Sequence, residues 1–207
     1  MTRTYDLGPP ARALDALLAA TTEDHLRART PCAEYTVGDL LDHLMGLTVA
    51  FRSAAEKSPG ADTAQTGTDG PGESSGPPKG NAANLHPAWR ERLPVQLDEL
   101  VAAWREPSAW TGMTEAGGVT LPADIMGTVA VNELVIHGWD LARATGQAYE
   151  CAPDSAQASF EFTSVAAAPG EGAGREGIFG PVVDVPPDAT VLDRSVGLSG
   201  RDPSWRP

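Results

Sequence analysis

The chain has 207 residues, 41% of them hydrophobic and 21% charged, which is typical of a globular protein with a substantial core. Its formal net charge is −13 and no stretch is basic, which argues against a nucleic-acid or anionic-membrane partner. The amino terminus lacks the apolar segment of a secretory signal, no run of 18 apolar residues occurs, and two cysteines are too few for a disulfide scaffold. We therefore expect a cytoplasmic protein, either a monomer or a homodimer.

Apolar residues recur at helical spacing in four segments, which predicts a mainly helical protein built on a four-helix bundle. Prolines 9 and 10 open the first segment, and Thr36 with Asp39 forms a capping box before the second. Pro94 lies inside the third, where it predicts a kink or a late start. Gly146 is expected to stop the fourth. The expected helices cover about residues 9–21, 36–57, 86–104 and 122–145.

A small β-hairpin is expected at 111–121, where Gly117 and Gly118 provide the turn. The bundle, with this hairpin, should occupy residues 1–150. Residues 151–207 are expected to form a short α/β extension packed on it. The extension should contain helices at about 153–168 and 189–199 and an extended stretch at 179–185.

The segment 58–84 differs in character from its surroundings. Its 27 residues include no Val, Ile, Leu, Met, Phe, Trp or Tyr, and Gly, Pro, Ser, Thr, Asp and Ala dominate. Such a segment has little to bury, which predicts a flexible insert. A linker is the favoured interpretation, and a lid over a site is the alternative.

Two polar residues interrupt the apolar surface of the fourth helix and suggest a site. Glu133 and His137 are four residues apart, so they lie on one helix face. Burying both is costly unless something compensates them, and a divalent metal would do so. His43, the one imidazole on the apolar second helix, is the best third ligand. A separation above about 8 Å between the two imidazoles would exclude a shared ion.

Each of these residues has a simpler explanation. His43 could be a hydrogen-bonded core histidine, and Glu133 with His137 a buried pair.

Asp140, three residues after His137, is expected to orient that imidazole. Cys32 is interpreted as a small buried hydrophobe, with a reactive or ligating thiol as the alternative.

Other polar residues near the predicted site are interpreted without a metal role. Asp42 is expected at the surface because it neighbours His43 and so points elsewhere. Trp139 is expected to pack in the core. Arg143 should point to a different side of the helix from Glu133 and His137.

Several motifs resemble the mycothiol-dependent maleylpyruvate isomerase family, and more closely its actinobacterial metal-binding branch. The most specific is the run His-Gly-Trp-Asp-Leu-Ala-Arg-Ala-Thr-Gly at 137–146, and the resemblance spans nearly the whole chain apart from the insert. The other matching pieces are Thr30-Pro31-Cys32, Tyr35-Thr36-Val37, the stretch 39–44, and the tail from Phe179 to Trp205. In this branch a Trp usually stands where this chain has Tyr35.

The resemblance implies a DinB-like four-helix bundle that binds a divalent metal through His43, Glu133 and His137. The metal is expected to be zinc, with nickel or iron as alternatives. It also implies mycothiol as co-substrate. The leading hypothesis is an enzyme that activates a low-molecular-weight thiol for isomerisation of, or S-transfer to, a small electrophilic metabolite. The alternatives are a hydrolase or lyase that uses metal-bound water, and a non-catalytic metal-binding protein.

Overall fold

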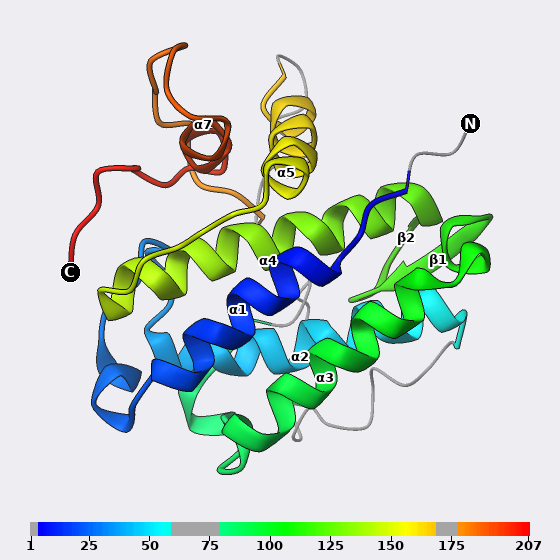
Figure 1. Ribbon diagram of the computed structural model, residues 1–207, viewed down its shortest axis with the longest axis horizontal. Coiled ribbons are helices and arrows are strands. Elements are labelled where there is room, and N and C mark those ends of the chain that lie inside the picture. Colours follow the sequence, from blue (N-terminus) through cyan, green and yellow to red (C-terminus); the bar gives the residue numbers. More distant parts are fainter. Residues whose placement is uncertain (1–3, 59–78, 169–177) are drawn as a thin grey trace.

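We describe the protein from a computed structural model, covering residues 4–58, 79–168 and 178–207. Helices dominate these residues, which also contain one two-stranded antiparallel sheet (Figure 1), so the predicted mainly helical class is confirmed. Among these residues, every helix is too short or too polar to cross a bilayer. The predicted insert at 58–84 lies mostly outside the described residues, which resume at Lys79.

Four helices form the bundle. Helix α1 packs against α3 and α4, and α2 packs against the same two helices, so the four surround one core. Leucines from all four helices fill this core. The helices are α1 (Gly8–Ala20), α2 (Val37–Glu56), α3 (Trp89–Arg105) and α4 (Ala123–Thr145).

The helix ends follow the sequence signals. Thr36 caps α2, accepting a hydrogen bond from the Asp39 amide at 3.3 Å while the Asp39 carboxylate accepts from the Thr36 amide at 2.8 Å. Gly146 ends α4 with φ of 68°, a left-handed conformation that favours glycine. Helix α3 continues through Pro94. The short helices η1 (Glu23–Arg27), η3 (Ala82–Asn84) and η4 (Pro107–Trp110) lie in the connections.

The hairpin joins β1 (Met113–Ala116) and β2 (Val119–Pro122), with Thr114 opposite Leu121. It contacts α2 and α4 at the end of the bundle where η4 also packs. Two buried tryptophans close this end: the Trp104 indole donates to the Phe51 carbonyl and the Trp110 indole to the Trp104 carbonyl.

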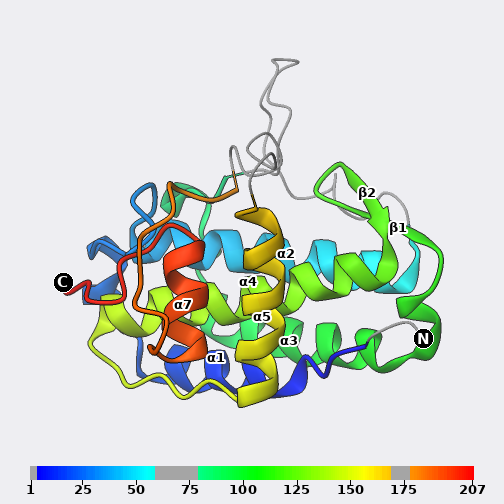
Figure 2. The ribbon, with the colours of Figure 1, turned by 90° about the horizontal axis from the view of Figure 1, so that it is seen from above.

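Helix α4 is covered on both sides. The bundle packs on one side, while α5 (Pro153–Ala166) crosses its other side and α7 (Val191–Leu198) packs on α5 (Figures 1 and 2). A small second cluster of Ile136, Trp139 and Val196 joins α4 to this C-terminal part. This double burial explains why α4 is apolar nearly all round. The stretch 179–185 has no regular secondary structure.

Candidate metal centre

Two facing helices bring three ligand-type side chains together. His43 lies on α2, and Glu133 and His137 lie one turn apart on α4, which packs against α2. The imidazole ring centroids are 4.9 Å apart, far inside the 8 Å limit set above. One nitrogen from each imidazole and one carboxylate oxygen all lie within 4.8 Å of one another. We call these three residues the triad.

The spacing of the ligand atoms suits a small divalent ion. Glu133 Oε2 lies 3.6 Å from His43 Nε2 and 3.1 Å from His137 Nε2. Ligands bound tetrahedrally at about 2.1 Å from zinc stand about 3.4 Å apart, which is close to both of these distances. Two imidazoles and one carboxylate are also a known donor set for catalytic zinc. The triad therefore fits a metal by both geometry and chemistry.

Asp140 holds the far side of the His137 ring. Its carboxylate Oδ2 lies 3.1 Å from His137 Nδ1, while Nε2 of the same ring faces Glu133. With a metal bound, this arrangement would keep a proton on Nδ1 and leave Nε2 to coordinate, because second partners of metal-bound histidines commonly fix the ring in this way. The sequence predicted an orienting role for Asp140, and the structure places its carboxylate against this ring.

A residue that the sequence analysis did not select completes this chain of contacts. Arg201, from the C-terminal part, donates to Asp140 from Nε at 3.2 Å and from an Nη nitrogen at 3.0 Å. Asp140 is fully buried and Arg201 is 7% exposed, so this is a two-pronged ion pair shielded from water. The second Nη nitrogen donates to the Ser199 carbonyl at 3.0 Å. The C-terminal part thus reaches the centre through Arg201.

The buried charges shift one another's pKa values. Burial by itself raises the pKa of Glu133, but hydrogen bonds and charge from His137 and His43 hold it well below its usual range. Burial likewise lowers the pKa of His137, but Asp140 and Glu133 outweigh it and raise the pKa to about 9. The pKa of Asp140 is lowered: Arg201 and His137 outweigh its burial. At neutral pH, without metal, both carboxylates are ionised and His137 is protonated.

The rim of the triad is formed by Tyr35 and by residues 79–84, which we call the strap. The Tyr35 ring lies 5.4 Å from the His43 ring, and its hydroxyl accepts a hydrogen bond from the Gly80 amide at 3.1 Å. Asp42, which was expected at the surface, is partly exposed, and its carboxylate accepts from the Asn81 amide at 2.9 Å. The strap is therefore fixed directly beside the triad.

Three other residues singled out in the sequence lie outside the triad. Arg143 donates to the Pro203 carbonyl and lies over the buried Trp139 ring, on a different side of α4 from Glu133 and His137. Cys32 is half-buried, and burial raises its thiol pKa, which favours the protonated form. The charge of Arg201 lowers this pKa, but burial outweighs it, so the surroundings favour the thiol over a reactive thiolate.

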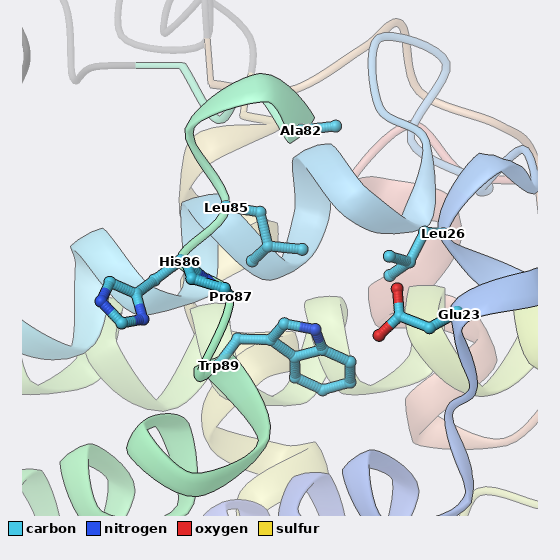
Figure 3. A pocket seen from close by; sticks show the side chains of 7 residues that line it. All are labelled: Glu23, Leu26, Ala82, Leu85, His86, Pro87 and Trp89. Carbon is cyan, nitrogen blue, oxygen red and sulfur yellow. The ribbon is translucent and has the colours of Figure 1, made fainter.

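A separate hollow lies between η1, the strap and the start of α3 (Figure 3). Its volume is about 250 Å³, and its lining includes Leu85, Trp89 and Glu23. Glu23 already pairs with Arg90. None of the triad residues lines this hollow.

Taken together, the fold and the triad define a DinB-like helical protein with a candidate two-histidine, one-carboxylate metal centre. The chain belongs to the family described as mycothiol maleylpyruvate isomerase N-terminal domain, whose model matches residues 7–142. That match confirms the resemblance inferred from the motifs and contains the whole triad. Arg201 lies outside it.

Among known proteins, the chain is similar to the uncharacterized proteins MT0763 and Rv0738 from two strains of Mycobacterium tuberculosis. Each is 27% identical over 155 residues, which cover 70% of this chain and 68% of the relative. No solved structure matches the chain.

Proposed function

We propose that the protein is an enzyme that holds a divalent metal, most simply zinc, through His43, Glu133 and His137. In this proposal the protein uses the metal centre to activate a low-molecular-weight thiol of the mycothiol kind, for isomerisation of, or S-transfer to, a small electrophilic metabolite. The observation that carries the proposal is the convergence of two imidazoles and one carboxylate within 4.8 Å, inside a family named for a mycothiol-dependent isomerase. A bound zinc ion would supply the positive charge that holds a coordinated thiol as its thiolate at neutral pH.

The chain's own residues set the charge of the centre. Glu133 and Asp140 each contribute one negative charge and Arg201 one positive charge, and His137 must lose its extra proton to coordinate. Together with a divalent ion, these side chains carry a net charge of +1. A centre of that charge favours a single anionic ligand such as a thiolate.

The burial of the triad shows which side is open. The His43 and Glu133 side chains are each 17% exposed, whereas His137 is 8% exposed and Asp140 is fully buried. A ligand would therefore approach beside His43 and Glu133, next to Tyr35 and the strap. The opposite side is closed by Asp140 and Arg201, which orient His137 and exclude water there.

The test is a thiol-dependent assay on protein loaded with zinc. Maleylpyruvate, the compound in the family's name, serves as the first candidate for isomerisation, and an activated alkene as the candidate for S-transfer. Each is measured with mycothiol, with cysteine and with no thiol. We expect turnover only with metal and thiol together. Turnover without thiol would instead support the use of metal-bound water.

Two variants complete this test. The His137→Ala variant should lose both its metal content and its turnover. His86→Ala removes an exposed imidazole outside the triad and should change neither. Full activity in metal-free protein would contradict the proposal.

A further inference from the structure

Tyr35 stands at the open side of the triad in a fixed position. Its backbone is held by a tight turn: its amide donates to the Cys32 carbonyl at 3.0 Å, and its carbonyl accepts from the Thr30 hydroxyl at 2.8 Å. The ring then lies against His43, with centroids 5.4 Å apart and planes inclined by 45°. This side chain is therefore placed by the loop before α2 and by His43.

The strap makes a hydrogen bond to the Tyr35 hydroxyl that leaves the O–H group available as a donor. The Gly80 amide donates to the hydroxyl oxygen and so occupies an acceptor position. A phenol also has one O–H donor, and no acceptor for it is found in the described part of the chain. A tyrosine hydroxyl ordinarily has a pKa of about 10, so it carries its proton at neutral pH.

Gly80 is needed for this arrangement because the strap runs very close to α2. A Cβ atom at position 80 would lie 2.8 Å from His43 Cβ and 2.9 Å from the His43 amide nitrogen, and would meet the Asp39 carbonyl as well. The next strap amides are held by carboxylates of α2: Asn81 donates to Asp42 at 2.9 Å and Ala82 to Asp39 at 2.7 Å. The strap therefore cannot move away from Tyr35 without breaking several bonds.

We infer that Tyr35 is a specificity-determining residue, whose hydroxyl donates a hydrogen bond to an oxygen of the ligand held at the triad. The ligand class is a small molecule with a carbonyl or carboxylate oxygen beside the atom that the metal holds. Gly80 sets the direction of the donor through its own hydrogen bond. This inference rests on the metal site of the proposed function and adds to it the chemistry by which a substrate is selected.

The experiment measures ligand binding to cobalt-loaded protein through the visible absorption of the metal. Acetohydroxamate presents oxygen acceptors, whereas ethanethiol binds through sulfur and presents none. In Tyr35→Phe, we expect the dissociation constant for acetohydroxamate to rise about 10- to 100-fold, as for loss of a hydrogen bond to a charged oxygen. Ethanethiol binding and cobalt content should stay at wild-type values.

Two further variants sharpen the result. Tyr5→Phe removes a phenolic hydroxyl that contacts Glu161 on α5 instead, and should bind both probes like the wild type. Gly80→Ala should also weaken the binding of acetohydroxamate, as Tyr35→Phe does, because the added Cβ displaces the strap.

The contradicting outcomes are distinct. Equal weakening of both probes, or no change, in a Tyr35→Phe protein that still binds cobalt would overturn this inference alone. Wild-type affinity in Gly80→Ala would overturn the part assigned to the strap. A wild-type protein that takes up no cobalt would overturn the inference and the proposed function together.

Discussion

Removing one partner of the ion pair between Arg201 and Asp140 should lower the free energy of unfolding. In Arg201→Met, Asp140 loses both hydrogen bonds from the guanidinium and, among the described residues, keeps His137 as its charged partner. Removing one partner of a buried pair typically costs 3–5 kcal/mol. Because the 3.1 Å contact with His137 survives, we expect the low end, about 3 kcal/mol.

The assay is urea unfolding of metal-free protein at pH 7, followed by circular dichroism. The double variant Asp140→Asn with Arg201→Met removes both charges. Its loss of unfolding free energy should be smaller than the sum of the losses in the two single variants, by about 1–3 kcal/mol. Arg206→Met, which removes an exposed guanidinium near the same terminus, is the control and should be nearly neutral. Single-variant costs that add to within about 0.5 kcal/mol would refute the coupling between these residues.

Three further predictions concern the charge of His137, the packing around two helix glycines and the bound metal. The His137 pKa of about 9 exceeds its unfolded value of about 6.5, so its stabilisation is complete below pH 6.5 and is lost as pH rises through 9. Urea titrations of metal-free protein from below pH 6.5 to above pH 9 should thus show the unfolding free energy falling by about 3 kcal/mol, and a flat profile would contradict this. Gly138→Ala should destabilise by about 1–3 kcal/mol, because its Cβ would lie 2.9 Å from the Tyr149 hydroxyl, whereas Gly46→Ala, with open space around it, should stabilise slightly by the same assay. EDTA should lower the Tm of zinc-loaded wild-type protein but not that of His43→Ala; equal shifts would count against the triad.

The bundle could be predicted because each helix carries its own signals. The capping box at Thr36 and the stop at Gly146 are local features, and the structure places the ends of α2 and α4 there. The triad could be predicted because Glu133 and His137 interrupt an apolar surface one turn apart, and His43 is the one imidazole on a second apolar helix. Such residue types are costly in those positions unless they are paired.

The rest of the site depends on contacts between distant segments. Arg201 is 61 residues from Asp140, and nothing local predicts that the tail turns back onto α4. The available signal was Arg201 inside the stretch from Phe179 to Trp205, which the sequence analysis used only for the resemblance. Similarly, the partner of Asp42 could not be predicted, because the Asn81 amide lies in a segment interpreted as a linker.

The measurement that tests the central claim most directly is anomalous diffraction at the zinc absorption edge, on crystals of the zinc-loaded protein. The account predicts one strong peak per chain, about 2 Å from Nε2 of His43, Nε2 of His137 and a carboxylate oxygen of Glu133. A peak elsewhere in the molecule, or no peak at these three side chains, would contradict it.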